Sequence, residues 1–212
     1  MNLYELTINQ TRDMILQVGK EIIENKERLN SADRVIGDGD HGAAMARGFA
    51  RVSQVLQDQS FDSIEELFIE TGNALLASVG GCAGILFGTF FRSGGKAISQ
   101  KKILDSKGLA VFTDAAFKAI QKRGGAQVGD KTMLDALYPA VQAASQASGS
   151  DLVQCLDQIS MAAQQGMEDT KNLMAVTGRA KKYGEQTIGQ PDPGAITTYL
   201  IFQGMKIFLQ TL

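Results

Sequence analysis

The sequence has few of the residues that mark out particular classes of protein. Only two of its 212 residues are cysteine and only one is histidine. Cys82 and Cys155 stand far apart without a C-x-x-C pair, which excludes a zinc site of that kind and a disulfide framework. A serine or cysteine triad would need the single histidine as its base. His41 directly follows Asp40, and no serine elbow occurs, so such a triad is not expected.

Long apolar runs and an excess of basic charge are also missing. No apolar run approaches the ~20 residues that a bilayer span requires, and the first residues are polar where a signal peptide needs its apolar stretch. The formal net charge is -2, which leaves no broad basic surface for nucleic acid or anionic lipid. We expect a cytoplasmic protein that binds neither nucleic acid nor membrane. Any anionic ligand must be held locally, by a few basic groups, backbone amides or metals.

The spacing of apolar residues is helical almost throughout. Apolar residues recur at steps of three, four or seven from Leu6 to Ile23 and again from Ile64 to Leu75. Two shorter sets repeat the pattern on the expected buried faces of further helices: Val111, Phe112, Ala115 and Ile120, and Leu152, Val153, Leu156 and Ile159. There is no convincing alternation of β-branched residues, and only three prolines occur. We therefore predict an all-α protein of about seven to nine helices, with residues 1–212 forming a single domain.

Several local signals place the ends of these helices. Ser63 and Glu66 predict a capping box, and Asp192 with Pro193 predicts an N-cap followed by proline at the first helical position. Pro139 is expected to kink or begin a helix. Glycine clusters separate the helices, including residues 37–42 and 80–81. Such clusters either allow close approach to a ligand or end helices as C-caps, and both interpretations stay open.

One glycine-rich loop carries three carboxylates within eight residues. Asp38 and Asp40 are separated by one glycine, which permits both carboxylates to turn toward one point, and Asp33 precedes them. Carboxylates this close repel one another unless a cation neutralises them. Oxygen ligands favour Mg²⁺, Ca²⁺ or Mn²⁺, and Mg²⁺ commonly completes its shell with substrate phosphates. The pattern predicts a metal site for a nucleotide; the alternative is a solvated turn that caps a helix near His41.

Two familiar phosphate-binding motifs do not account for this loop. Gly37, Gly39 and Gly42 match the letters of G-x-G-x-x-G, but the strand and βαβ unit that the dinucleotide fingerprint requires are not predicted. The P-loop is not matched either, because Phe90 stands at its first glycine and Ala97 follows Lys96. His41 is interpreted either as a structural hydrogen-bonding residue or as a phosphate donor at a helix start.

The motifs together resemble a known family, the nucleotide-binding L subunit of dihydroxyacetone kinase. The matching segments are residues 33–42, 45–49, 78–81, 86–91, 123–124, 129–133, 178–180, 184–185, 188–189 and 192–195. They follow the order of the family and span nearly the whole chain. The resemblance implies an antiparallel eight-helix barrel or bundle with the nucleotide at one end.

The resemblance also implies roles for individual residues. Asp33, Asp38 and Asp40 would coordinate two Mg²⁺ ions that bridge the phosphates of ADP or ATP. The expected nucleotide-binding residues are His41, Gly42, Ala43, Ala44, Cys82 and Ala83 at the phosphates, Gly124 and Met133 at the adenine, and Arg179, Asp192, Pro193 and Gly194, which close the site. A solvated surface arginine and a core methionine are the alternatives for Arg179 and Met133. Cys82-Ala83 replaces the usual Ala-Ser, so a hydroxyl contact to phosphate is missing.

The implied activity is phosphotransfer to a sugar held elsewhere. The chain is too short for the family's substrate domain, so dihydroxyacetone would be carried by a separate K subunit. ADP would be recharged by an M subunit, a phosphoprotein of the phosphotransferase system. A homodimer is compatible with this reading. The alternatives are a kinase subunit that uses freely exchanging ATP on another ketose, and a nucleotide-sensing module that docks on a transcription factor.

Overall fold

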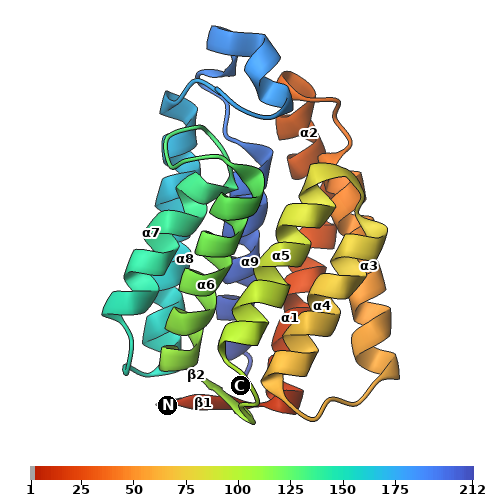
Figure 1. Ribbon diagram of the computed structural model, residues 1–212, viewed down its shortest axis with the longest axis vertical. Coiled ribbons are helices and arrows are strands. Elements are labelled where there is room, and N and C mark those ends of the chain that lie inside the picture. Colours follow the sequence, from red (N-terminus) through yellow and green to blue (C-terminus); the bar gives the residue numbers. More distant parts are fainter. Residues whose placement is uncertain (1–2) are drawn as a thin grey trace.

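A computed structural model describes residues 3–212 as a set of helices that run side by side along its long axis (Figure 1). The α-helices of this part of the chain are α1 (Ile8–Glu24), α2 (Lys26–Ile36), α3 (His41–Asp58), α4 (Ile64–Ser78), α5 (Gly81–Ala97), α6 (Ser106–Gly124), α7 (Met133–Gln146), α8 (Leu152–Asp169) and α9 (Pro193–Leu209). The predicted all-α class is confirmed. The single domain predicted for residues 1–212 and the eight-helix barrel both stay predictions. Residues 1 and 2 of that domain lie outside the described residues.

The chain also contains two short strands that the sequence did not predict. β1 (Glu5–Thr7) pairs antiparallel with β2 (Ile103–Asp105), with Leu6 opposite Leu104. Leu6 was expected on the first helix, but it lies in β1 and is fully buried. Three residues are too short a stretch to show an alternating pattern. Both strands lie at the lower end of the molecule, together with the C-terminal end of the chain (Figure 1).

The predicted apolar faces form one hydrophobic core. The apolar residues predicted for α4 are all buried, and α9, which is apolar on nearly all sides, lies among the other helices (Figure 1). Ile23, Val111 and Val153 were placed on buried faces, but they are exposed because each lies beside the core stripe of its helix. Among residues 3–212, no helix is both long and apolar enough to cross a membrane.

The predicted helix ends are confirmed in most details. Asp192 caps α9 by accepting a hydrogen bond from the Ala195 amide, and Pro193 follows it. Ser63 accepts from the Glu66 amide at 3.1 Å, but the Glu66 carboxylate accepts from the amide of Asp62 instead of Ser63. Only one of the two hydrogen bonds of the predicted capping box is therefore present, the one to the Ser63 side chain. Two short 3₁₀ helices, η1 (Thr170–Asn172) and η2 (Arg179–Thr187), lie between α8 and α9.

The glycine-rich connections gather at the end of the molecule away from the strands. The α2–α3 loop, the α4–α5 junction and the starts of α7 and α9 all contribute to this end. Residues 170–192, which include η1 and η2, cross over it (Figure 1). Segments that are far apart in the sequence therefore meet at one place.

Candidate functional site

The three aspartates lie where α2 gives way to α3. Asp33 was expected in the loop, but it belongs to the last turn of α2, and Asp38 and Asp40 follow in the turn. α2 ends at Ile36 and α3 begins at His41, so Gly37–Asp40 reverses the chain. Gly39 has φ +80°, which favours glycine. A Cβ on Gly37 would lie 2.0 Å from Oδ1 of Asp33. Both glycines are thus required for the loop to close around the Asp33 carboxylate.

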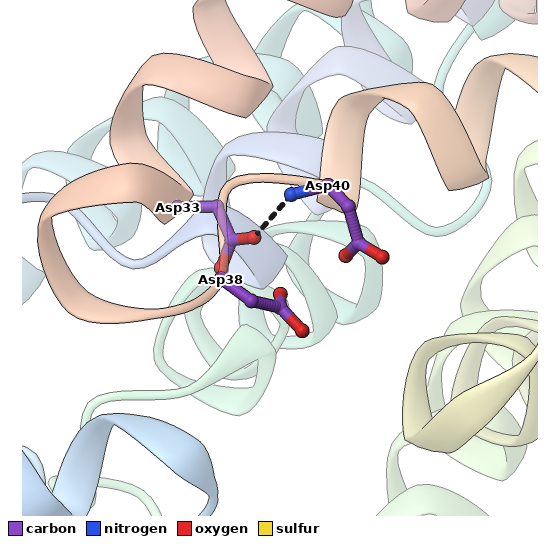
Figure 2. Close-up of side chains that lie close together, drawn as sticks. All are labelled: Asp33, Asp38 and Asp40. Carbon is purple, nitrogen blue, oxygen red and sulfur yellow. Dashed lines mark hydrogen bonds between the residues drawn. The ribbon is translucent and has the colours of Figure 1, made fainter.

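Asp33 organises this loop through one carboxylate oxygen. Its Oδ2 accepts hydrogen bonds from the amides of Gly39, Asp40 and His41, at 2.9, 3.0 and 3.2 Å. Figure 2 shows the bond from Asp40, with the carboxylates of Asp33, Asp38 and Asp40 grouped around the turn. One ligand oxygen from each aspartate lies within 4.8 Å of the others. This set of hard oxygen donors fits a divalent cation such as Mg²⁺.

The aspartates differ in their electrostatic surroundings. Burial raises the pKa of Asp40, and the neighbouring carboxylates of Asp38 and Asp33 raise it further. Loss of hydration alone would raise the pKa of Asp38, but its interaction with Asp40 and the charge of Arg179 lower that pKa. Arg179 of η2 forms an ion pair with Asp38. Three carboxylates with one guanidinium leave the cluster with net negative charge, which a bound cation would neutralise.

His41 is held inside the molecule at the start of α3. Its Nε2 lies 2.8 Å from Oγ1 of Thr197 on α9. Burial lowers the pKa of His41, against the raising effect of Asp33 and Asp38, so the neutral imidazole is favoured. The ring therefore contacts α9 through a hydrogen bond.

A cavity of about 370 Å³ opens beside the aspartates. The predicted site residues that line it are Asp33, Asp38, Asp40, His41, Ala44, Cys82, Ala83, Met133, Arg179, Asp192, Pro193 and Gly194. They come from α2, α3, α5, α7, η2 and α9 and from the adjoining loops. The fold thus brings together most of the residues that the family resemblance selected.

Three predicted site residues do not line this cavity. A Cβ on Gly42 would lie 2.1 Å from the Lys26 carbonyl oxygen, so Gly42 faces α2 and allows α3 to pack against it. The amide of Ala43 donates to Oδ1 of Asn30 at 3.0 Å, which occupies it within the protein. Gly124 lies at the end of α6, and a Cβ there would approach Leu86, a residue of the cavity wall.

Lys131 belongs to the cavity wall, although the sequence did not single it out. Its side chain is fully buried and its backbone has φ +62°. The ammonium donates to the carbonyl oxygens of Thr170 and Gln190, the latter at 2.5 Å. Residues 129–133 were named from the sequence only as a segment that matches the family, and nothing in that segment marked Lys131 as buried. Only the fold reveals that this lysine ties the segment of η1 and η2 to the start of α7.

The same segment contacts the aspartate loop at a second place. The hydroxyl of Tyr183 donates to the Gly37 carbonyl oxygen at 3.0 Å, near the ion pair between Arg179 and Asp38. At its other end, Oγ1 of Thr170 accepts from the Asp192 amide at 3.0 Å. Residues 170–192 are therefore attached both to the aspartate loop and to the start of α9.

Asp192 makes folding stability depend on pH. Burial raises the pKa of its carboxyl from 3.8 to about 7, in spite of the Ala195 amide and Lys131, which lower it. Because the folded state holds this proton more tightly than the unfolded chain, the contribution to stability is complete below pH 3.8 and is lost as the pH rises through about 7.

Asp192→Asn is therefore expected to flatten the decline in stability between about pH 4 and pH 7. Asparagine is also a good N-cap and keeps the acceptor for the Ala195 amide. Urea unfolding at several pH values measures the change. Asp151→Asn makes the same substitution at the N-cap of α8 and is the matched control: an equal change of slope in both variants would point to the capping substitution and not to Asp192. A wild-type slope in Asp192→Asn would contradict the assignment.

Comparison with known proteins identifies the family. Residues 35–206 match the family model described as the DAK2 domain. The chain is 37% identical over 187 residues to the PEP-dependent dihydroxyacetone kinase 1, ADP-binding subunit DhaL, of Listeria innocua, covering 88% of this chain and 89% of the relative. This chain belongs to the DAK2 domain family. The predicted family, that of the L subunit of dihydroxyacetone kinase, is confirmed, and with it the enzyme class, a phosphotransferase.

Two further relatives extend this finding. The corresponding PEP-dependent ADP-binding subunit DhaL of Escherichia coli is 36% identical over 205 residues, covering 95% of this chain and 97% of the relative. The dihydroxyacetone kinase of C. freundii, solved with AMP-PNP and Mg²⁺, has a similar fold with a TM-score of 0.73 and 25% identity. That likeness covers 97% of this chain but 35% of the C. freundii chain.

Proposed function

We propose that this DAK2 protein is the ADP/ATP-binding subunit of a dihydroxyacetone kinase. It transfers phosphate from nucleotide to dihydroxyacetone held by a separate K subunit. The observation that supports this most strongly is the group of three carboxylates beside a cavity of about 370 Å³. The names of the Listeria innocua and Escherichia coli relatives, which describe ADP-binding subunits, agree with it.

The phosphates belong at the end of the cavity formed by the aspartates and the start of α5. Gly80 and Gly81 adopt φ +80° and +56°, and the N-cap residue makes no side-chain hydrogen bond to the helix. The first amides of α5 therefore have no intrahelical acceptor and favour an anion, as helix starts do. The Arg179 side chain is 65% exposed at the cavity and can bind phosphate oxygens.

The aspartates would hold two Mg²⁺ ions against these phosphates. Bound magnesium offsets the charge that moves between oxygens during phosphoryl transfer. Asp33 keeps the loop closed by accepting amides with Oδ2, and its carboxylate together with those of Asp38 and Asp40 would hold the metal. Arg179 forms an ion pair with Asp38. A bound metal ion would therefore compete with the guanidinium for this carboxylate.

The apolar part of the cavity suits the adenine base. Leu86 and Phe87 of α5 line this wall, and Met133 of α7 is 4% exposed. A methionine side chain adapts to a flat ring and tolerates displacement. Gly124 keeps the neighbourhood of Leu86 free of a further side chain. We therefore place the adenine against Leu86, Phe87 and Met133.

The sugar and the phosphate donor are assigned to other chains. This chain covers 97% of the Escherichia coli subunit but only 35% of the C. freundii kinase. The Escherichia coli relative is named as a subunit, whereas the C. freundii kinase carries the matching part within a longer chain. We assign dihydroxyacetone to a K subunit and the recharging of ADP to an M subunit, because the relatives are named as PEP-dependent.

Thermal unfolding with ADP and Mg²⁺ tests the nucleotide site. A ligand at ~100 times its dissociation constant should stabilise the folded state by about 2.7 kcal/mol. ADP without Mg²⁺ should give a much smaller shift, because the aspartates then repel the phosphates. If ADP with Mg²⁺ leaves the midpoint unchanged, the nucleotide site is refuted.

Reconstitution tests the reaction and its donor. The chain is mixed with a K subunit and dihydroxyacetone, and either phosphoenolpyruvate with the phosphotransferase proteins or ATP alone is added. We expect product formation with the phosphoenolpyruvate system and retention of ADP through dialysis. Faster turnover with ATP and loss of ADP on dialysis would favour the freely exchanging kinase. Nucleotide binding without any phosphotransfer would favour the sensing module.

A further inference from the structure

A second hollow lies on the outer side of α5, away from the aspartates. Its volume is about 200 Å³, and it is lined by Leu76, Gly88, Thr89, Arg92, Ser93, Lys96 and Arg123. These residues come from α4, α5 and α6, with α5 in the middle (Figure 1). The lining contains three cationic side chains, two hydroxyl groups and no carboxylate. The side chains of this hollow therefore carry positive charge, whereas those of the aspartate loop carry negative charge.

The hollow exists because α4 and α5 approach each other closely. A Cβ on Gly72 would lie 2.5 Å from Cγ of Arg92 and 2.6 Å from the Gly88 carbonyl oxygen. A Cβ on Gly88 would lie 3.0 Å from the Gly72 carbonyl oxygen. The two glycines therefore bring the helices together and leave room for the stem of Arg92. The wall of the hollow is rigid helix backbone rather than loop.

The cations in this hollow lack partners within residues 3–212. Nε of Arg92 is buried and makes no hydrogen bond there. No ion pair with any described residue is formed by the three cations, Arg92, Lys96 and Arg123. A buried donor without an acceptor is costly, and like charges gathered in a hollow repel one another. Both costs would be removed by an anion bound between the three side chains.

The donor set also selects the kind of anion. Guanidinium groups bind phosphoryl and carboxylate oxygens in pairs. A phosphoryl dianion offers more oxygens and more charge than a carboxylate, which matches two arginines, one lysine and the Ser93 hydroxyl. The volume suits one such group and is smaller than the nucleotide cavity. We propose that this hollow, here called the α5 anion pocket, binds the phosphoryl group of inorganic phosphate or of a small phosphate monoester.

A titration followed by backbone amide NMR tests this site in the whole chain. Inorganic phosphate is added without Mg²⁺ and with a chelator, so that the aspartates repel it. We expect saturable shifts at Gly88, Thr89 and Ser93, with a dissociation constant on the order of 1 mM for so small a ligand. Glycerol 3-phosphate is titrated in parallel and shows whether a monoester binds more tightly than free phosphate. Either of these two results supports the proposal.

Arg123→Gln provides the decisive variant, because Arg123 is exposed and its loss does not threaten folding. We expect about tenfold weaker phosphate binding, the effect of losing one charge-assisted contact. Arg92→Gln should weaken binding at least as much. Lys122→Gln is the matched control: it removes the same charge from the same turn of α6 without touching the pocket, and should bind as wild type does.

Several results would overturn the proposal. These are an absence of saturable shifts, wild-type affinity in Arg123→Gln, equal losses in Lys122→Gln, and shifts confined to residues 80–83 of the nucleotide cavity. Acetate that binds as tightly as phosphate would refute the preference for a phosphoryl group. The site is independent of the proposed kinase activity. ADP with Mg²⁺ should stabilise Arg123→Gln as much as wild type, so failure of one proposal is distinguishable from failure of the other.

Discussion

Replacing Asp38 by alanine is expected to reduce phosphotransfer by the reconstituted kinase at least ~10³-fold while the protein stays folded. The Asp38 side chain is 50% exposed, and its ion pair is with an Arg179 that is 65% exposed, so little stability depends on it. Removal of one of three adjacent carboxylates also relieves repulsion in the metal-free protein. What the substitution removes is a proposed metal ligand. Activity and the Mg²⁺-dependent thermal shift with ADP should disappear together.

Asp33→Ala distinguishes a metal ligand from a residue that also holds the loop. Asp33 accepts three amides, so its removal should lower stability by about 1–3 kcal/mol as well as abolish activity. Asp58→Ala, at the exposed end of α3, changes the charge equally and should retain activity.

An Asp38→Ala protein that still binds ADP with Mg²⁺ as wild type does would exclude the aspartate loop as the metal site.

Lys131→Met is expected to give the largest loss of stability, about 2–4 kcal/mol. The buried ammonium donates to the carbonyl oxygens of Thr170 and Gln190, and methionine leaves both without this donor. The effect should be concentrated in residues 170–192, which lose their attachment to the start of α7. Trypsin should then cleave faster at Lys171, Arg179, Lys181 or Lys182. Urea unfolding gives the global loss, and limited proteolysis locates it.

Lys118→Met is the matched control for this prediction. Lys118 pairs with Asp114 on the exposed side of α6, and the loss of such a pair should change stability by no more than about 0.5 kcal/mol. It should leave the cleavage of residues 171–182 at the wild-type rate. If Lys131→Met were as stable and as resistant as Lys118→Met, the lysine would not be what holds this segment.

Local patterns in the sequence were sufficient for the helices and most of their ends. The apolar spacing of α4 and the N-cap at Asp192 were correctly predicted because both depend on residues within one or two turns. The same reasoning placed Ile23, Val111 and Val153 on buried faces, and these placements were wrong. Periodicity gives the direction of an apolar stripe, but the neighbouring helices decide how wide the buried part is.

The site, like the fold, has parts that could be predicted from local sequence and parts that could not. The grouping of Asp33, Asp38 and Asp40 was predictable, since all three fall within eight residues, although Asp33 lies at the end of α2 and not in the loop. Cys82, Met133 and Arg179 were assigned only through the family resemblance, because nothing local connects them with that loop. The cavity that they line together supports the placement. Lys131 and the α5 anion pocket escaped notice because their partners lie on other elements.

The sequence by itself therefore determined a helical protein with an aspartate-rich, metal-suited loop and a recognisable family. Apolar spacing, capping residues and the Asp-Gly-Asp turn act over a few residues, and such distances can be read along the chain. The tertiary structure alone decided that residues 170–192 cross over this loop, and that Lys131 and Tyr183 attach them. It also decided that Gly72 and Gly88 bring α4 and α5 together. These contacts join residues that are distant in sequence, and packing of the whole core fixes which of them meet.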